Sequence, residues 1–239
     1  MEQLNEEQVE AFDKEYVNNN RWVPIKRCID RDFPDGQFSF LDLGGGNGLF
    51  ADRMLASYPK STGVVLDNSP LLLDRNRPSA RKRVVLGSVE NLACMDLTKY
   101  DLVFFNWVLH HLVSRSFARS CENIDGALRS VMALLTERGR VSISENMYNG
   151  LVIDGLPGWL VYQLTSAKII SWLTKKGGAN TAGVGVCFRS YSEWCSTVQR
   201  IGFRILDFTN DDAWQIPWTW NAFLHIGHIR CGHFWLSLQ

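Results

Sequence analysis

Short apolar runs alternate with amphipathic segments along the first two thirds of the chain. Five runs have the length of a strand, and most of the longer segments between them repeat apolar residues with the period of a helix; the runs are 38–43, 61–67, 81–88, 100–107 and 140–145. The run at 100–107 is apolar almost throughout, as is typical of a parallel strand buried on both faces. Strands alternating with helices predict an α/β fold with a doubly wound, mostly parallel sheet.

The pattern changes on both sides of this region. Residues 1–36 predict one or two N-terminal helices, and residues 150–186 hold an apolar helical segment followed by a glycine-rich run, which we interpret as a cap insertion after the fifth strand. A helical pattern resumes at Ser190, and apolar runs at 204–209 and 221–238 bring the expected sheet to seven strands. A length of 239 residues fits one domain.

Charge and cysteine usage narrow the class of protein. The 25 Lys and Arg residues equal the 25 Asp and Glu residues, so no overall field attracts nucleic acid or an anionic membrane. The six cysteines show neither a C-x-x-C pair nor a disulfide framework spacing, which favours reduced thiols. No signal peptide or membrane-spanning run is present in the pattern. We therefore expect a cytoplasmic protein with no nucleic-acid or membrane partner.

An acid and alternate glycines follow the first strand. The stretch "SFLDLGGGNGLF" (39–50) places Asp42, Gly44, Gly46 and Gly48 where the strand turns into a helix. Glycines there let the backbone approach a ligand, and the helix N-terminus offers N–H groups. A dinucleotide fingerprint requires a third glycine where Leu49 stands, and a P-loop requires a Gly-Lys-Ser/Thr that is missing.

This pattern resembles motif I of class I S-adenosylmethionine-dependent methyltransferases. Four later stretches resemble further motifs in order: Asp67 closing the second strand, "LGSVENL" (86–92), "YDLVFFNWVLHHL" (100–112) and "LLTERGRVSISE" (134–145). The resemblance covers 38–145 and resumes at 188–208. It implies one Rossmann-like methyltransferase domain over 1–239, with S-adenosylmethionine as cofactor and S-adenosylhomocysteine as product.

The resemblance also implies a cofactor site. Asp67 matches the acid that accepts the ribose hydroxyls, while Ser88 replaces the aspartate that usually stands near adenine, which leaves that contact to backbone groups and Val89. The implied cofactor residues are Asp42, Gly44, Gly46, Asp67, Asn68, Ser88, Val89 and Asn106.

Within the family, the closest local similarity is to small-molecule O-methyltransferases. Their "W-V-L-H-D-W" motif is similar to "NWVLHHL" (106–112), which implies that His110 is the general base and that Glu145 orients it. His111 replaces the acid of that motif. The second carboxylate of the family has no counterpart, because no Asp or Glu occurs between Asp154 and Glu193.

The acceptor class follows partly by exclusion. The chain lacks the Asp/Asn-Pro-Pro turn of enzymes that methylate base amines and the Pro-Cys of cytosine-C5 enzymes. We expect methyl transfer to an oxygen, with a nitrogen as the second choice, of an apolar or aromatic small molecule in biosynthesis. Two alternatives stay open: a protein or tRNA methyltransferase using the basic cluster at 75–83, and a non-catalytic cofactor-binding partner subunit.

The cap should cover the acceptor. Residues 157–173 are apolar on more than one helical face, so one face is expected to meet the core and another a substrate or a second subunit, as in a homodimer. Trp172 belongs to this segment, and Trp214, Trp218 and Trp220 are expected to close the other side. The substrate candidates are Trp107, His111, Met147, Tyr148, Trp159 and Tyr162.

The C-terminal stretch "HIGHIRCGHFW" (225–235) could suggest zinc. On a strand, however, His228 points away from the face shared by His225, Cys231 and His233, and a structural zinc site needs four converging ligands. We expect strand histidines bound to ordinary partners and no metal.

Overall fold

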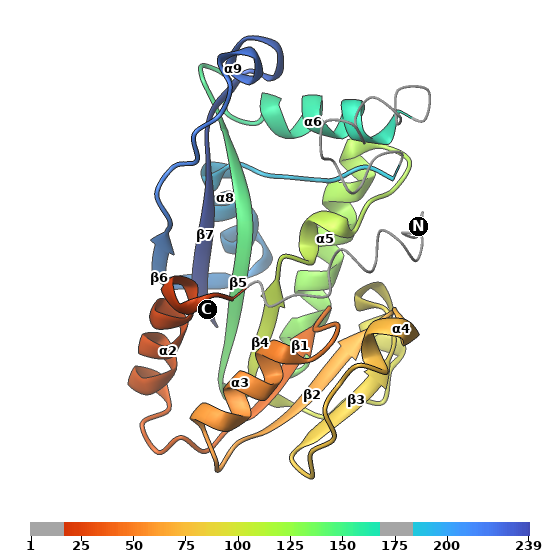
Figure 1. The fold of residues 1–239 in the computed structure, drawn as a ribbon, viewed down its shortest axis with the longest axis vertical. Helices are drawn as coiled ribbons and strands as arrows, with labels where there is room; N and C mark the ends of the chain where they lie inside the picture. The colour runs from red at the N-terminus through yellow and green to blue at the C-terminus, as the bar shows by residue number, and fades with distance from the viewer. Residues whose placement is uncertain (1–16, 168–183) are drawn as a thin grey trace.

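The fold was analysed in a computed structural model, which describes residues 17–167 and 184–239. A seven-stranded sheet runs through it in the order β3-β2-β1-β4-β5-β7-β6 (Figure 1). The strands are β1 Ser39–Leu43, β2 Thr62–Asp67, β3 Lys82–Leu86, β4 Tyr100–Asn106, β5 Leu135–Gly150, β6 Phe203–Asn210 and β7 Ile226–Leu238. β1 to β5 are parallel, and β7 is antiparallel to both β5 and β6. The predicted doubly wound, mostly parallel sheet is confirmed.

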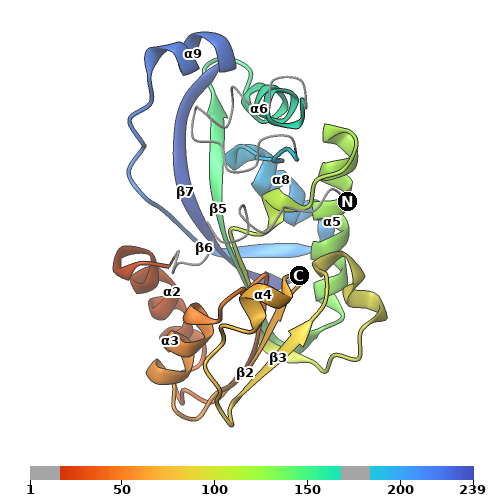
Figure 2. The ribbon, with the colours of Figure 1, turned by 45° about the vertical axis from the view of Figure 1, so that its right-hand side comes forward.

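Helices cover both faces of this sheet (Figure 2). They are α2 Asn19–Asp32, α3 Leu49–Ser57, α4 Pro70–Leu73, α5 Phe117–Met132, α6 Leu156–Ser166, α8 Tyr191–Ile201 and α9 Trp218–Leu224, with 3₁₀ turns η1 Val89–Cys94 and η2 Leu109–His111. On β4, Leu102 and Phe104 pack toward α2 and α3, whereas Val103 and Phe105 pack toward α5 and α8. This alternation explains why the strand is apolar throughout, since both of its faces are buried.

β5 is longer than the sequence predicts at both ends. Its first residues bulge, because Tyr100 pairs with Leu135 while Leu102 already pairs with Arg140. At the other end, β4 stops at the pair Asn106–Ser144, and the rest of β5 pairs with β7 alone. The two strands continue as a ribbon that carries α6 and α9 at its far end (Figure 1). Glu145 therefore lies inside β5, at the point where β4 ends.

The N-terminal and cap predictions fall partly outside the described residues. Residues 1–16 and 168–183, and with them Trp172, are not described. Of the predicted N-terminal helices the structure describes α2, and of the predicted cap it describes α6 and the residues that flank it. None of the described helices has the length and apolar character needed to cross a membrane.

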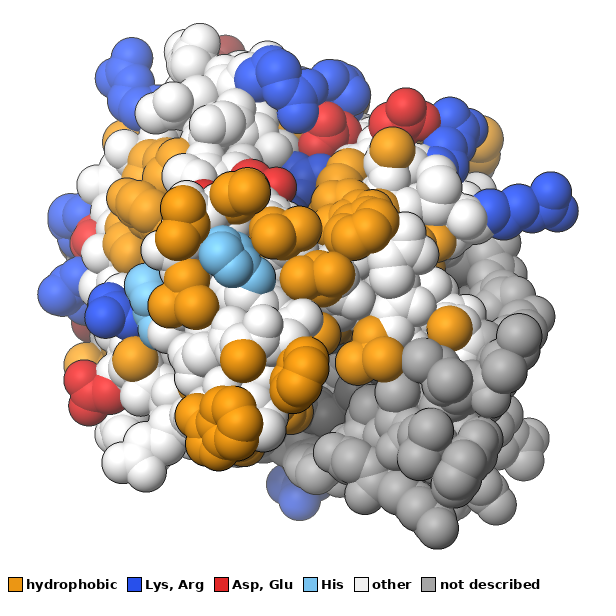
Figure 3. Space-filling model, turned by 90° about the horizontal axis from the view of Figure 1, so that it is seen from above, with side chains coloured by type: hydrophobic (Ala, Val, Ile, Leu, Met, Phe, Trp, Pro, Cys, Tyr) orange, Lys and Arg blue, Asp and Glu red, His pale blue; other side chains and the backbone are white. Residues whose placement is uncertain are grey.

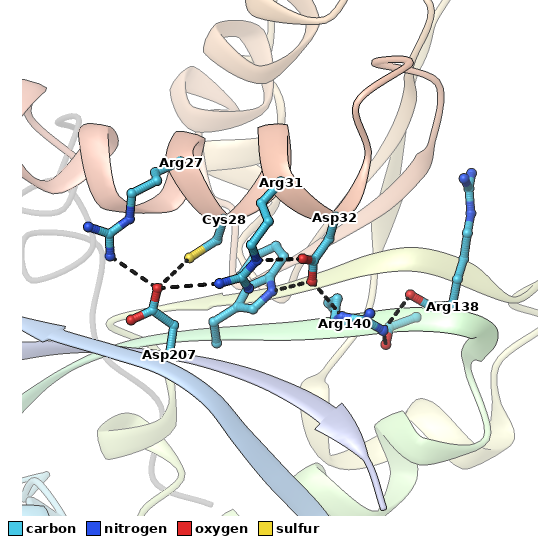
Figure 4. Close-up of polar contacts among 9 residues, drawn as sticks. Arg27, Cys28, Arg31, Asp32, Arg138, Arg140 and Asp207 are labelled. Carbon is cyan, nitrogen blue, oxygen red and sulfur yellow. Dashed lines mark hydrogen bonds and ion pairs between the residues drawn. The ribbon is translucent and has the colours of Figure 1, made fainter.

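α2 is attached to the C-terminal half of the sheet by a polar network (Figure 4). Asp32 Oδ2 accepts hydrogen bonds from Arg140 Nε on β5 at 2.7 Å and from Trp235 Nε1 on β7 at 2.9 Å. Asp207 on β6 pairs with Arg27 at 3.0 Å. One face of α2 thus reaches three strands, and its apolar residues complete the core on that side.

Replacing Asp32 with alanine should lower the free energy of unfolding by about 2–3 kcal/mol, because a charged acceptor of two partly buried donors is lost. Burial acts to raise the pKa of Asp32, but bonds from Arg31, Trp235 and Arg140 leave it below its ordinary value. A lowered pKa in the folded state gives stability that is present above pH ~4 and is lost as the pH falls through the folded value. Denaturation should show that the difference in the free energy of unfolding between the variant and the parent is smaller at pH 3 than at pH 7. Asp35→Ala, at an exposed position, is the control, and an equal deficit there would contradict the assignment.

Candidate active site

The turn between β1 and α3 requires its alternate glycines. Gly44, Gly46 and Gly48 have φ angles of +70°, +50° and +73°, which residues with a side chain rarely adopt. Gly44 N donates to Leu66 O at 2.7 Å, so the turn lies against the carboxyl end of β2. The backbone is bare where a ligand of an open α/β sheet would lie.

Gly45 is constrained by packing rather than by its dihedral angles. A Cβ atom at this position would lie 2.5 Å from Asp42 Oδ2 and 2.9 Å from Val65 Cγ1. The sequence pattern did not assign this glycine, because the constraint arises from where the Asp42 side chain folds back under the turn.

Asp67 joins the end of β2 to the glycine turn. Its Oδ2 accepts from Gly46 N at 2.9 Å and its Oδ1 from Ser69 N at 2.8 Å. Burial is the main cause that raises its pKa above the ordinary value, against the lowering effect of the backbone hydrogen bonds. Each carboxylate oxygen can accept a second bond, so this arrangement is compatible with the expected ribose contact.

Asp42 and Asn106 form a buried polar pair at the ends of the central strands β1 and β4. Asn106 Nδ2 lies 3.4 Å from Asp42 Oδ1. Asp42 Oδ2 and Asn106 Oδ1 are both buried and find no hydrogen-bond partner in the part of the chain that the structure describes. Unsatisfied buried acceptors are costly, so one on each of two neighbouring side chains fits a ligand that brings donors, such as a protonated amino group.

The loop after β4 is strained and packs onto the glycine turn. Trp107 has a φ of +54° although it is not glycine, a conformation that costs about 1–3 kcal/mol. Its Nε1 donates to Asn146 Oδ1 at 3.1 Å, and the Arg21 guanidinium lies over its ring. The next residue, Val108, contacts the turn so closely that a Cβ at Gly44 would lie 2.4 Å from it. Trp107 and Val108 thus connect the end of β4 to the η2 turn that follows.

η2 brings His110 to Glu145. His110 Nδ1 lies 2.6 Å from Glu145 Oε2, while Glu145 Oε1 accepts from Leu109 N at 2.8 Å. Both side chains are buried. The His110 ring stacks on Phe188, with centroids 4.8 Å apart. A carboxylate on Nδ1 favours the tautomer with the proton on that nitrogen, which leaves Nε2 free of its proton and able to act as a base.

The sequence matches a known family over this same region. Residues 41–141, from β1 into β5, match the family model described as "Methyltransferase domain". This match identifies residues 41–141 as a methyltransferase domain, and the order of the strands is that of the class I S-adenosylmethionine-dependent methyltransferases. A domain of this kind uses S-adenosylmethionine as its cofactor and gives S-adenosylhomocysteine as the product.

Solved structures share the methyltransferase fold. LepI in complex with S-adenosylmethionine has a TM-score of 0.61 at 14% identity, covering 97% of this chain and 51% of that chain. An S-adenosylhomocysteine complex of a methyltransferase from Geobacter sulfurreducens has a TM-score of 0.61 at 12% identity, covering 97% and 96%. The mitomycin 7-O-methyltransferase MmcR has a TM-score of 0.53 at 15% identity, covering 92% and 56%.

These identities establish the fold alone. The chain spans about half the length of LepI and of MmcR, and nearly the whole length of the Geobacter protein. No curated protein matches this chain in sequence.

The remaining expected cofactor residues of the methyltransferase lie near the ends of β2 and β3. Ser88 caps η1, its Oγ accepting from Glu90 N at 3.3 Å, and Val89 is buried in the core. Asn68 is exposed beside Asp67. Asn76 was not identified from the sequence; its Nδ2 donates to Gly46 O at 2.8 Å and braces the turn from the segment after α4.

The raised pKa of Asp42 leads us to expect that cofactor binding depends on pH. Burial raises its pKa to about 7, so near pH 7 much of the ligand-free protein carries a neutral carboxyl. The ammonium group of a bound ligand favours the ionised form of the Asp42 carboxyl, so binding lowers the pKa of Asp42. Affinity for S-adenosylhomocysteine should rise about tenfold from pH 6 to pH 8, with proton release, and then level off.

Calorimetry in two buffers of different ionisation enthalpy measures this proton release. Asp42→Asn should bind more weakly and should lose the pH dependence. An unchanged slope in that variant would contradict the assignment of the proton to Asp42.

The substrate candidates do not all lie at the dyad. His111 packs against His110, with ring centroids 4.0 Å apart, and burial followed by the neighbouring His110 lowers the pKa of His111 well below its ordinary value. Tyr148 stacks on Phe188 at 4.3 Å. Met147 packs in the core between the sheet and α5 and α8. Phe188, which had no place among the expected site residues, thus links Tyr148 to His110.

The candidates on α6 face opposite ways. Tyr162 is buried and donates from its hydroxyl to Ser114 O at 2.8 Å, tying α6 to the loop before α5, whereas Trp159 is exposed. Hydrophobic side chains gather at this end of the molecule (Figure 3). The most exposed are Val152 at 86%, Trp218 at 75% and Phe223 at 74%, with Trp214 and Trp220 less exposed.

The C-terminal histidines have separate partners. His225 Nε2 accepts from Val152 N and Ile153 N, both at 3.0 Å, and His228 Nε2 lies 3.0 Å from Asn149 Nδ2. His233 Nε2 lies 3.0 Å from Ser142 Oγ, and burial lowers its pKa to about 4. Over residues 17–167 and 184–239, no cluster of three potential ligands is suited to a metal.

Proposed function

We propose that this methyltransferase moves the methyl group of S-adenosylmethionine to an oxygen of an apolar or aromatic small molecule, with His110 as the general base. The observation that supports this proposal most is the buried contact of 2.6 Å between His110 Nδ1 and Glu145 Oε2. It lies where β4 and β5 part, at the same edge of the sheet as the glycine turn. The bound cofactor would supply an electrophilic methyl group.

The residues of the chain divide the remaining work. Asp42 and Asn106 offer acceptors for the amino group, and Asp67 offers acceptors for the ribose. His110 Nε2 takes the proton of the acceptor hydroxyl as the oxygen attacks, and Glu145 stabilises the imidazolium that forms. Phe188 stacks on the imidazole ring and limits its movement. Positioning and proton removal are the contributions required of the protein.

The surroundings of His110 favour an apolar acceptor. Its ring is flanked by Phe188 and, beyond it, Tyr148, and the apolar end formed by α6 and α9 lies at the end of the same β5–β7 ribbon. The likeness to MmcR, a mitomycin 7-O-methyltransferase, supports an oxygen acceptor on a small molecule. A homodimer through the exposed apolar end stays a prediction.

The alternative with a nucleic-acid or protein substrate has less support. Lys82 of the basic cluster is buried and pairs with Asp52 at 2.5 Å. Arg81 is half-buried and donates to three backbone carbonyls, those of Leu55, Tyr58 and Ser61. Two of the five basic residues thus brace α3 and the loop after it rather than face a polyanion.

A labelling assay tests the proposal. The purified chain is incubated with S-adenosylmethionine carrying a labelled methyl group and with phenols, amines of matched size, unmodified tRNA or a mixed peptide library. Label should enter a phenol, with one S-adenosylhomocysteine formed per methyl transferred. Label in tRNA or peptide alone would overturn the acceptor class. Cofactor binding without turnover on any acceptor would favour the partner-subunit alternative.

A further inference from the structure

Two cysteines from distant segments meet behind the η2 turn. Cys121 Sγ on α5 lies 3.6 Å from Cys187 Sγ, in the segment between α6 and α8. Cys187 is buried, and its backbone N donates to His110 O at 2.9 Å. The next residue is Phe188, whose ring stacks on His110. The thiol pair is therefore joined to the proposed base through one hydrogen bond and one ring contact.

Cys121 is reachable from solvent. It lines a surface cleft together with Arg189, Thr197 and Arg200, whereas Cys187 does not line it. Asp125 holds both guanidinium groups, that of Arg189 at 3.1 Å and that of Arg200 at 2.6 Å. Arg189 Nη2 also donates to Cys121 O at 2.9 Å. The positive end of Arg189 is thus fixed beside Cys121.

The two thiols differ in acidity. The hydrogen bond from the Cys187 thiol, and then the charge of Arg189, lower the pKa of Cys121 to about 7, although burial and the negative charge of Glu193 act against this. The same hydrogen bond and burial raise the pKa of Cys187. Cys121 is therefore suited to be the attacking thiolate, and Cys187 to be the second thiol that resolves the adduct.

We propose that Cys121 and Cys187 form a reactive dithiol site that takes a low-molecular-weight disulfide and closes to an internal disulfide. The Cys121 thiolate attacks one sulfur of the small disulfide, a mixed disulfide forms, and one small thiolate leaves. Cys187 then loses its proton to solvent and attacks Cys121 Sγ, which expels the second small thiolate. The two protein thiols are oxidised, and the small disulfide is reduced to two thiols.

Closure should alter the base. A disulfide bond measures about 2.05 Å, so the sulfur atoms must approach by roughly 1.5 Å from their separation of 3.6 Å. That movement pulls on the hydrogen bond to His110 and displaces Phe188. The glycine turn and Asp67 are held by hydrogen bonds to Leu66, Ser69 and Asn76, so cofactor affinity should stay unchanged. This consequence for methyl transfer rests on the proposed function, whereas the thiol chemistry does not.

The test uses the full chain and glutathione disulfide at pH 7. Intact mass and peptide mapping should show a Cys121–Cys187 disulfide that dithiothreitol reverses. Cys187→Ala should stop at a mixed disulfide on Cys121, and Cys121→Ser should give neither product. Cys195→Ser, on the neighbouring helix, is the matched control and should behave as the parent. The exposed Cys94 should form a mixed disulfide only.

The outcomes separate the two claims. Absence of the internal disulfide in the parent, while Cys94 reacts, would overturn the dithiol site whether or not the chain transfers methyl groups. If the disulfide forms, oxidation should lower the methyl-transfer rate at least about tenfold without changing affinity for S-adenosylhomocysteine. An unchanged rate in an active, fully oxidised sample would overturn the coupling to His110.

Discussion

Replacing His110 with alanine should lower methyl transfer to a phenol by about 10²–10⁴-fold, with affinity for S-adenosylhomocysteine intact. The physical reason is that Nε2 of the imidazole is the proposed proton acceptor, whereas the cofactor is expected at Asp42, the glycine turn and Asp67. Single-turnover rates with cofactor saturating measure the chemical step, and calorimetry measures the binding.

Matched variants separate the two neighbouring histidines. His111→Ala removes a ring that packs on His110 and should have the smaller effect. Glu145→Gln keeps the shape but weakens the support of Nδ1, so it should lower the rate and shift its pH profile without abolishing binding. A fast His110→Ala together with a slow His111→Ala would show that the base is the other histidine. If both remain fast, the acceptor needs no protein base.

Asp67→Ala should weaken S-adenosylhomocysteine binding by roughly 10–100-fold, from the loss of charge-assisted hydrogen bonds worth about 1.5–3 kcal/mol. The loss has two sources, because Asp67 would accept from the ribose and already holds Gly46 N in place. Gly46→Leu should also weaken binding, since a φ of +50° disfavours a side chain and the backbone would be covered.

Gly126→Ala is the control for the glycine variant, because a Cβ at this helical position meets nothing within 4 Å. It should leave binding unchanged. Titration calorimetry of the folded variants tests this assignment. An affinity equal to that of the parent in both Asp67→Ala and Gly46→Leu would show that the cofactor does not bind at this turn.

The parts of the fold that the sequence predicted are those with a local cause. The strand at 100–107 is apolar throughout because successive side chains enter two different cores. Alternate glycines are visible in the sequence because positive φ angles exclude most other residues. His110 and Glu145 could be paired in advance because the resemblance to small-molecule O-methyltransferases implies both residues, and because β4 and β5, which carry them to the site, are adjacent parallel strands.

Other features depend on contacts between distant segments. The extension of β5 beyond Ser144 is stabilised by β7 alone, and β7 lies some eighty residues later in the chain. Phe188 and Cys187 follow the cap in the sequence but contact His110, which lies before it. Gly45 is constrained by the Asp42 side chain folded beneath it. The basic cluster at 75–83 left open a substrate such as tRNA, but Lys82 is buried and pairs with Asp52, a contact that no sequence period reveals.

The most direct test of the account is the electron density of the chain crystallised with S-adenosylhomocysteine and a phenol. The predicted result is the amino group on Asp42 Oδ2 and Asn106 Oδ1, the ribose on Asp67, and the phenol oxygen within hydrogen-bond distance of His110 Nε2. Cofactor density away from the glycine turn, or a phenol bound without contact to His110, would contradict it.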